Sequence, residues 1–339
     1  MNPLNSQFDE FRKNIEPPMA YKKIAAKADD PVREHLESHD SFAEHHKSTY
    51  LYGSYRRQTS ILNIKDVDIV VVTNFKKTDD PLEVLQTLRD SLEELYEKTD
   101  VADQRRSIRI DRPLPDNPKA KVTLDVIPAI IRNSQTNSLW VPDRDKKEWV
   151  ASHPQGHISY TSELNAKSGM FVPLAKMMKW WWQHQWELQN PSRKSHERRP
   201  KGFWIEVMCG DFADPKPDTY AEMIHNLLAN VKEGFGSYWK TGVMPELADP
   251  GLDGETIKTS MSTAEFATFL RAIEAAKDHA RRALDAKTEA EAANHWRKLF
   301  GDKFPVVAEA NTLQAAAGLT GALTFPPKAL TPSRPAGFA

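Results

Sequence analysis

The sequence predicts an α+β fold, in which a lobe of mixed strands and helices packs on a helical lobe with a cleft between them. Two patterns in the 339 residues predict it. Before about residue 150, apolar runs of strand character alternate with helical periodicity, whereas the pattern is mostly helical from about residue 145 onward. Two lobes of this kind commonly enclose a ligand between them.

The elements can be placed in order from their spacing and their flanking residues. Leucines recur about every 3.6 residues between Pro81 and Thr99, which predicts a helix. β-branched runs predict strands, and Pro-rich segments predict loops. In chain order, the expected elements are helices within residues 1–50, a turn and strand in 50–72, a helix over 81–99, strands over 106–111 and 121–131 with a loop over 113–118 between them, a helix over 172–188 and a basic loop over 192–201.

Residues 53–68 carry most of the chemical information. A small-residue turn, Gly53-Ser54, is followed after eleven residues by Asp66 and Asp68, and the second Asp opens a β-branched run. Residues two apart on a strand point to the same side. Asp66 and Asp68 therefore present two like charges together, which repel unless a cation lies between them. Mg²⁺, a hard cation that prefers oxygen ligands, suits such a pair.

A third carboxylate lies within a separate strand pattern. Asp125 is surrounded by apolar residues in the run 121–131, where an unpaired buried charge would be costly. Beside Asp66 and Asp68 in a sheet, it would complete a cage able to hold two metal ions about 4 Å apart. Taken singly, an Asp-x-Asp pair is commonly a solvated strand end and a Gly-Ser pair only a turn. The combination favours a metal site.

The spacing Gly-Ser-x₁₁-Asp-x-Asp, with a distant strand Asp, resembles the signature of the polymerase-β-like nucleotidyltransferase superfamily. Within it, roughly residues 40–310 resemble the CD-NTases, bacterial relatives of the metazoan sensor that makes cyclic GMP-AMP and of 2′-5′ oligoadenylate synthase. Three further segments carry the resemblance: Leu174–Trp181, Gly202–Val207 and Trp296–Pro305. One departure is Gln58, which stands before Thr59 where the family often has Gly, and which puts the local loop conformation in question.

The resemblance implies a nucleotidyltransferase lobe packed on a helical lobe, with a nucleotide cleft between them. It implies synthesis of a cyclic di- or trinucleotide second messenger from ATP, alone or with another NTP, in antiphage defence of the CBASS type. It also implies two Mg²⁺, replaceable by Mn²⁺, and a carboxylate that accepts the proton of the attacking ribose hydroxyl. The implied residues are Asp66, Asp68 and Asp125 for catalysis and metal binding, Gly53, Ser54 and Lys176 for the triphosphate, and Phe203 for the nucleobase.

Two other functions remain open at this point. One is a different enzyme of the same superfamily, either a linear oligoadenylate synthase or a transferase that nucleotidylates RNA, protein or a small molecule. The other is a non-catalytic module that binds nucleotides or nucleic acid, against which the three intact carboxylates argue. The identity of the bases, the ring size and the 2′-5′ or 3′-5′ linkage cannot be read from the sequence.

The predicted helix over 172–188 has two faces. One is an apolar stripe of core character, and the other carries Lys176, Lys179, Trp180 and Gln183. Both lysines can be interpreted as solvated surface residues. The resemblance favours a phosphate contact for Lys176, a task that suits the compact charge of an ammonium group.

Composition limits the environment and the partners. The net charge of −1 gives no overall attraction to nucleic acid or to anionic membranes. The basic loop over 192–201 lacks interleaved aromatic residues, so we expect no requirement for nucleic acid. Cys209 is the only cysteine, residues 1–10 lack a signal-peptide pattern, and no apolar run approaches a membrane span of about 20 residues. We therefore expect a cytoplasmic protein without membrane contact.

We expect three parts along the chain. Residues 1–150 would form the catalytic lobe with the N-terminal helices, 151–323 the helical lobe, and 324–339 a flexible tail, because its proline density disfavours helix. The tail ends in small residues around Phe338. By resemblance to CD-NTases that carry such a tail, a ubiquitin-transfer-like partner would conjugate the C-terminal Ala339, and a downstream effector would respond only to the product.

Overall fold

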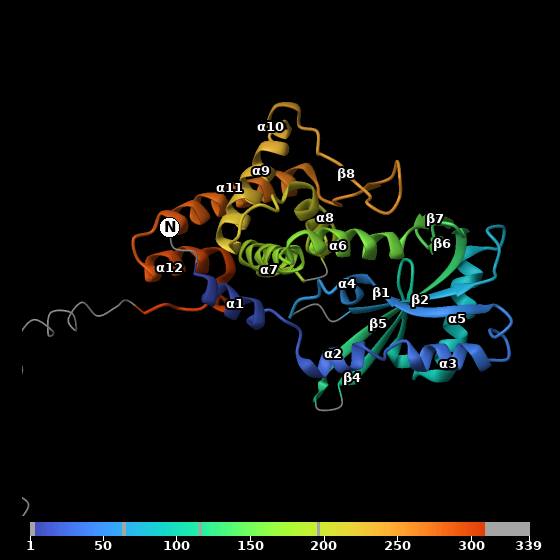
Figure 1. Cartoon of the computed structure of the whole chain (residues 1–339). Coiled ribbons are helices and arrows are strands. Elements are labelled where there is room, and N and C mark those ends of the chain that lie inside the picture. Colours follow the sequence, from blue (N-terminus) through green and yellow to red (C-terminus); the bar gives the residue numbers. More distant parts are fainter. Residues whose placement is uncertain (1–3, 63–65, 115–116, 195–196, 309–339) are drawn as a thin grey trace, which may run out of the picture.

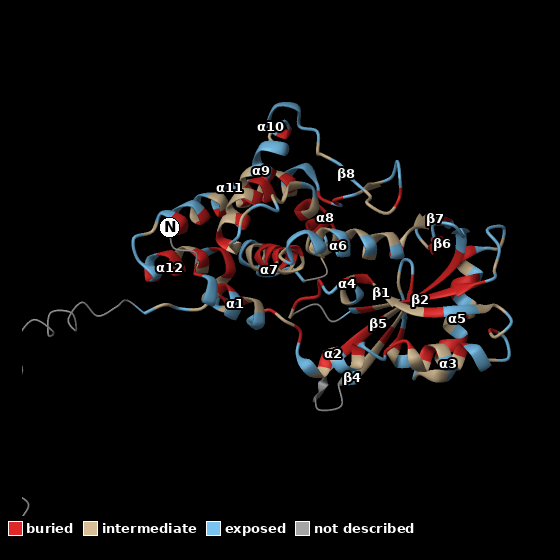
Figure 2. Ribbon diagram, in the orientation of Figure 1, coloured by how far each residue is buried: buried red, intermediate tan, exposed pale blue. Residues whose placement is uncertain are grey.

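The structure is a computed structural model, in which residues 4–62, 66–114, 117–194 and 197–308 are described. It has two lobes (Figure 1). One is built on a seven-stranded sheet, and the other is made almost wholly of helices. Figure 2 shows buried residues along the strands of the first lobe and at the centre of the second.

Seven strands form one mixed sheet. They are β1 (His46–Tyr52), β2 (Asp66–Thr73), β3 (Val101–Asp103), β4 (Ile108–Leu114), β5 (Asn117–Asn133), β6 (Ser138–Asp143) and β7 (Glu148–Ser152). Their order is β1-β2-β5-β4-β3, and β6 and β7 extend the sheet from the C-terminal part of the long strand β5. β2 and β5 pair in parallel. The two strands expected to carry the carboxylates are therefore direct neighbours.

Alternation along β2 and β5 sends successive side chains to opposite faces of the sheet. Val67, Ile69 and Val71 share a hydrophobic core with Leu124 and Val126. The helices that contribute to this core are α2 (Met19–Ala25), α3 (Asp30–Ser38) and α5 (Pro81–Leu95). The residues that alternate with these core residues on both strands point to the opposite face.

The second lobe is a helical assembly with an aromatic core. Its helices are α6 (Pro154–Ser168), α7 (Phe171–Gln189), α8 (Gly202–Phe212), α9 (Tyr220–Gly234), α10 (Tyr238–Thr241), α11 (Thr263–Asp285) and α12 (Glu289–Phe300), with a short hairpin of β8 (Leu247–Ala248) and β9 (Thr256–Ile257). The ring of Phe269 meets Trp182 edge-on at 4.8 Å and Trp204 at 5.6 Å between centroids. Such edge contacts add to the large apolar area that each ring buries. A 3₁₀ turn, η3 (Gly301–Lys303), follows α12, and another, η1 (Lys98–Asp100), lies in the first lobe.

The first helix, α1 (Asn5–Asn14), packs in the helical lobe. The ring of Phe8 lies 5.1 Å from that of Trp296, and the ring of Phe11 lies 4.5 Å from that of Phe300. We expected the N-terminal helices to belong to the first lobe. α1 instead packs in the helical lobe, because its buried aromatic side chains contact those of α12. The division of the chain at residues 150 and 323 stays a prediction.

Most predicted elements are present, but the loop expected over 113–118 is largely strand, because β4 extends to Leu114 and β5 begins at Asn117. The helical half of the chain begins at Pro154 rather than near residue 145, because strand β7 lies before it. On α7, the side chains of Lys179, Trp180 and Gln183, expected on a more polar face, are buried. This helix packs against α6, α8 and α12, so its position among other helices buries residues that its periodicity alone assigns to the surface.

Within the described ranges, the structure has no helix that is long and apolar enough to cross a membrane. The expected tail, residues 324–339, and with it Ala339, lies outside the described residues.

Candidate active site

The three predicted carboxylates lie on neighbouring strands and on one face of the sheet. In the parallel register, Asp68 of β2 stands opposite Asp125 of β5, and Asp66 stands opposite Thr123. Val67 and Leu124 point into the core between the sheet and its helices. Because side chains alternate, Asp66, Asp68 and Asp125 all point to the other face. The sheet thus brings together the three residues that the sequence pattern singled out.

Burial raises the proton affinity of these carboxylates. Desolvation raises the pKa of Asp68 to about 6; the charge of Arg57 opposes this shift and that of Asp66 adds to it. Desolvation and then the charges of Asp68 and Asp66 raise the pKa of Asp125 to about 7. The pKa of Asp66 is raised by burial as well, against the charges of Arg109 and Lys201. The positive groups of the protein therefore only partly compensate for the burial of the negative charge on each carboxylate.

The donor set fits a divalent cation. Oδ1 of Asp125 is buried and has no hydrogen-bond partner, so its acceptor capacity is available to a ligand. Three carboxylates on one face supply the oxygen donors that Mg²⁺ prefers. In the described part of the chain, no three acidic, His or Cys side chains already converge as metal ligands. Binding an ion would therefore require Asp66, Asp68 and Asp125 to be drawn closer together.

The Gly-Ser turn lies directly against the carboxylates. Gly53 begins the short helix α4 (Gly53–Arg56) with a φ of +70°. A Cβ added at Gly53 would lie 1.7 Å from Oδ2 of Asp68, so glycine is required here by contact as well as by backbone conformation. The hydroxyl of Ser54 is hydrogen-bonded to that of Ser60 at 3.1 Å.

Gln58 adopts the conformation that glycine would favour at its position. Its φ is +62°, in the left-handed region. A side chain in this region costs about 1–2 kcal/mol. The N–H of Thr59 still donates to the carbonyl of Ser54 at 2.9 Å, which closes the turn. The turn is therefore closed by this hydrogen bond while Gln58 holds a left-handed backbone conformation.

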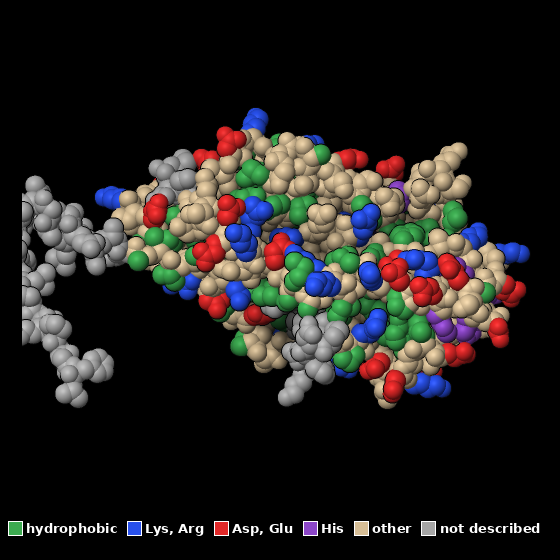
Figure 3. Space-filling view, turned by 60° about the horizontal axis from the view of Figure 1, so that its bottom comes forward, with side chains coloured by type: hydrophobic (Ala, Val, Ile, Leu, Met, Phe, Trp, Pro, Cys, Tyr) green, Lys and Arg blue, Asp and Glu red, His purple; other side chains and the backbone are tan. Residues whose placement is uncertain are grey.

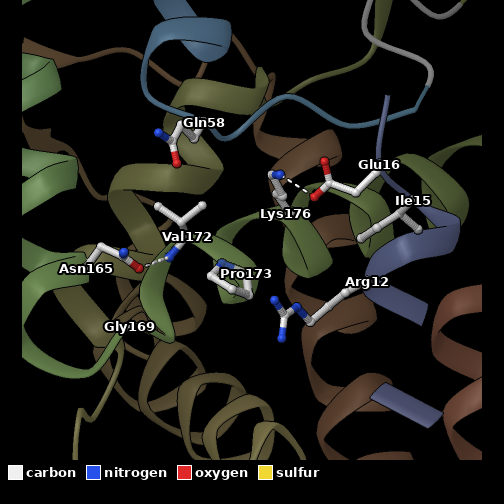
Figure 4. Close-up of a pocket in the computed structure, with 9 residues that line it drawn as sticks. All are labelled: Arg12, Ile15, Glu16, Gln58, Asn165, Gly169, Val172, Pro173 and Lys176. Atoms are coloured by element: carbon white, nitrogen blue, oxygen red, sulfur yellow. Dashed lines mark hydrogen bonds and ion pairs between the residues drawn. The ribbon is translucent and has the colours of Figure 1, made fainter. Parts of the chain in front are cut away.

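Lys176 does not contact the carboxylates. Its Nζ donates to Oε1 of Glu16 at 2.5 Å, and the described structure contains no ion pair between Lys176 and any of the three Asp residues. The two side chains lie in the wall of a cavity of about 260 Å³ that Gln58 also lines (Figure 4). The sequence-predicted phosphate ligand is therefore held by the segment that follows α1.

Phe203 lies at the first turn of α8, half-buried between charged and aromatic neighbours. The guanidinium carbon of Arg57 lies 4.7 Å from its ring centroid, and the ring of His157 lies at 4.6 Å. His157 is in turn bonded through Nε2 to Oδ1 of Asp249 at 2.7 Å. Phe203, which the resemblance implies for the nucleobase, is thus already in contact with Arg57 and His157.

Three charged residues near the site were not assigned to it from the sequence, which interpreted Lys179 as a surface residue. Arg57, Lys179 and Glu206 form a buried ion cluster, in which Glu206 pairs with both cations at 2.7 Å. A signal was present, because Lys179 and Glu206 each interrupt a strongly apolar run.

The end of the basic loop also approaches the carboxylates. Burial and then neighbouring arginines lower the pKa of Lys201 to about 8, and the charge of Asp66 opposes them.

Comparison with known proteins assigns the family. A model described as the Second Messenger Oligonucleotide or Dinucleotide Synthetase domain matches residues 1–165. The cyclic AMP-AMP-AMP synthase of Acinetobacter sp. is 31% identical over 350 residues, covering 98% of this chain and 97% of that protein. The chain belongs to the CD-NTase family. A cyclic AMP-AMP-GMP synthase of Enterobacter hormaechei is also similar to this CD-NTase, with 26% identity over 99% of this chain and 100% of that protein.

Solved structures share the fold of this CD-NTase. CdnG of Bradyrhizobium diazoefficiens in complex with GTP has a TM-score of 0.72 at 17% identity, covering 88% of this chain and 96% of CdnG. CdnC of E. coli MS115-1, in a complex with HORMA-deltaN, has a TM-score of 0.69 at 16% identity, covering 89% and 98%. The prediction of a polymerase-β-like nucleotidyltransferase that makes a cyclic oligonucleotide second messenger is thereby confirmed.

Proposed function

We propose that this CD-NTase joins three ATP molecules into a cyclic trinucleotide of AMP units, in a reaction that depends on Mg²⁺ and serves antiphage defence. The observation that carries the metal-dependent transfer is the register of Asp68 beside Asp125, with Asp66 on the same face. The product is favoured by the similarity to the cyclic AMP-AMP-AMP synthase of Acinetobacter sp. along nearly the whole chain.

The carboxylates and the turn would act together on the triphosphate. Asp66, Asp68 and Asp125 would hold two Mg²⁺, which supply charge neutralisation for the attacking and leaving oxygens when bound. One of these carboxylates would accept the proton of the ribose hydroxyl that attacks the α-phosphate, while pyrophosphate leaves. Ser54 would turn its hydroxyl from Ser60 to a phosphate oxygen. Because Gly53 has no Cβ, a phosphate bound at the turn lies beside Asp68.

Product analysis tests this function. The purified protein would be incubated with Mg²⁺ and ATP alone, and then with mixed NTPs, and the products analysed by mass spectrometry and phosphatase treatment. The expected product is a phosphatase-resistant ring of three AMP units, which is absent from the Asp68→Asn, Asp125→Asn double variant. Linear chains with a 5′-triphosphate would instead identify a linear oligoadenylate synthase. Incorporation of GMP would identify a mixed ring, and dependence on an added acceptor would identify another kind of transferase.

We expect synthesis to need no nucleic-acid activator. On the face that Figure 3 shows, Lys and Arg side chains are interspersed with Asp and Glu rather than gathered in one broad basic patch. An activating duplex would require several phosphate contacts, with a corresponding dependence on salt. Protein that is silent with NTPs and Mg²⁺ but becomes active when a duplex is added would overturn this expectation.

We further propose that a ubiquitin-transfer-like partner conjugates Ala339. The proposal comes from the sequence of the Pro-rich tail, which lies outside the described residues. Every proposed catalytic residue lies far upstream, so deletion of residues 337–339 should leave nucleotide synthesis unchanged in vitro. The same deletion should abolish C-terminal conjugates in cells that contain the partner. Absence of conjugates of the intact protein in such cells would contradict the proposal.

A further inference from the structure

A buried ion cluster is centred on Glu206 of α8, whose side chain is 0% exposed. Its Oε1 accepts hydrogen bonds from Nε of Arg57 at 2.7 Å and from the hydroxyl of Thr161 at 2.9 Å. Its Oε2 accepts from the hydroxyl of Thr59 and from Nζ of Lys179, both at 2.7 Å. The acceptor positions of this carboxylate are therefore filled entirely by protein groups.

The partners of Glu206 come from both lobes. Arg57 and Thr59 follow α4, at the end of the segment that begins with the Gly-Ser turn. Thr161 lies on α6 and Lys179 on α7. Lys179 also donates to the hydroxyl of Thr59 at 2.9 Å and to its carbonyl oxygen at 3.2 Å. The helical lobe thus binds both the side chains and the backbone of the segment that follows α4.

Backbone hydrogen bonds connect Arg57 and Thr59 to the Gly-Ser turn, which contacts the carboxylate site. The N–H of Arg57 donates to the carbonyl of Gly53 at 3.1 Å, and the N–H of Thr59 donates to that of Ser54 at 2.9 Å. Gly53 in turn approaches Asp68 so closely that no Cβ fits between them. A continuous chain of contacts therefore runs from Glu206 through Arg57 and Thr59 to Asp68.

We propose that Glu206 is a positioning residue. From the helical lobe, it holds the Gly-Ser turn in place beside Asp68. It acts through Arg57, Thr59 and Lys179 and does not touch the reacting atoms. The inference rests on the proposed function, because it assigns the turn and Asp68 to the same catalytic site. Three buried charges carry a desolvation cost that an apolar core of equal volume would avoid, and their directional hydrogen bonds supply the placement that such a core lacks.

The first test compares turnover in two destabilised variants. Glu206→Gln keeps the shape of the side chain but removes the charge, and we expect kcat at saturating ATP to fall by about tenfold or more because the turn is no longer held in place. Ile273→Ala is the control for stability, since Ile273 is buried on α11, which packs against α9 and α12. It should lower Tm without lowering kcat when both are assayed well below Tm. Equal kcat in Glu206→Gln and the wild type would overturn the proposal.

A second readout does not depend on activity. Hydrogen exchange of the Arg57 and Thr59 amides should speed up by about tenfold or more in Glu206→Gln, because their hydrogen bonds within the turn open more often. The Ile273→Ala variant should leave these two amides unchanged relative to the wild type. If the exchange of the turn in Glu206→Gln matches that of the wild type, Glu206 does not position it.

A conservative pair covers the case in which Glu206→Gln fails to fold. Thr59→Val removes the hydroxyl that Glu206 and Lys179 share, whereas Thr59→Ser keeps it. The Val variant should lose kcat and the Ser variant should keep it; equal kcat in both would overturn the proposal. A wild-type protein that forms no phosphodiester product would contradict the proposed function alone, because hydrogen exchange would still decide the positioning role.

Discussion

Gly53 and Asp68 are in contact across the gap between the Gly-Ser turn and strand β2, where Oδ2 of Asp68 occupies the space that a Cβ of residue 53 would need. The turn begins directly after Tyr52, which pairs with Asp68 in the register of β1 and β2, so the sheet itself places Gly53 beside this carboxylate. A nucleotide phosphate bound at the turn would therefore lie beside the carboxylates by construction of the fold. The consequence can be tested with a single methyl group.

Gly53→Ala should abolish nucleotide transfer. The new Cβ would lie 1.7 Å from Oδ2 of Asp68 and must displace the turn or the carboxylate. Gly242→Ala is the matched control, because Gly242 has a φ of +68° and nothing within 4 Å of an added Cβ. Both variants should lose about 1 kcal/mol of stability from the left-handed backbone. Transfer should be lost only in Gly53→Ala, and wild-type turnover of that variant would contradict the arrangement.

Mg²⁺ should stabilise the wild-type protein through Asp68 and Asp125. A ligand at a hundred times its Kd stabilises the folded state by about 2.7 kcal/mol, which appears as a rise in Tm. The Asp68→Asn, Asp125→Asn variant should show no such rise, although it should melt at a higher temperature than the wild type when Mg²⁺ is absent. Calorimetry with and without the ion measures both effects. A Mg²⁺-dependent rise of equal size in the variant would place the ion elsewhere.

The stability of the metal-free protein should fall as pH rises toward neutrality. The folded-state pKa values of Asp68 and Asp125 are raised to about 6 and about 7, from an ordinary value of 3.8. A raised folded-state pKa contributes stability that is fully present below the unfolded value and is lost as pH passes through the folded one. The Tm advantage of the double Asn variant should therefore be large at pH 8 and vanish near pH 4. The Asp253→Asn variant controls for the removal of a carboxylate at an exposed position.

The carboxylate site was accessible from the sequence because it depends on local rules. Alternation along a strand places Asp66 and Asp68 on one face, and the apolar run around Asp125 marks a second strand. The parallel pairing of the two strands was not predicted, since alternation does not specify which strands become neighbours or in which direction they pair.

The remaining contacts depend on partners that are distant in the chain. Glu206 binds Thr59 across 147 positions, and Lys176 binds Glu16 across 160. A charge within an apolar run signals that a buried partner exists, but not which residue supplies it. Burial of Lys179 likewise depends on partners outside α7, because its Nζ donates to Thr59, 120 positions away, and to Glu206, 27 positions away.

Gln58→Gly should stabilise the protein without loss of transfer. Gln58 holds a φ of +62°, which glycine adopts without steric cost. The gain is partly offset by the greater freedom of glycine in the unfolded chain, so we expect about 0.5–1 kcal/mol. Gln58→Ala keeps the strained backbone and should give no gain, which separates the backbone effect from loss of the amide. A lower Tm for the Gly variant would show that the side chain of Gln58 contributes more than its strain costs.

Lys176 can serve the triphosphate only by leaving Glu16, and paired variants test whether it does. If it does, Lys176→Ala removes a charge-assisted contact of about 1.5–3 kcal/mol and weakens ATP binding by about ten- to a hundredfold. Adenosine binding should be unchanged, because adenosine carries no phosphate. Glu16→Gln removes the competing carboxylate, so that variant should bind ATP more tightly than the wild type.

The exposed Lys23→Ala variant controls for the loss of one positive charge and should bind ATP as the wild type does. Calorimetric titration without Mg²⁺ keeps metal binding out of the comparison. If Lys176→Ala and Glu16→Gln both bind ATP with wild-type affinity but melt at a lower temperature, the pair only anchors the segment after α1 to α7. In that case the Gly-Ser turn and the carboxylates would hold the triphosphate without Lys176.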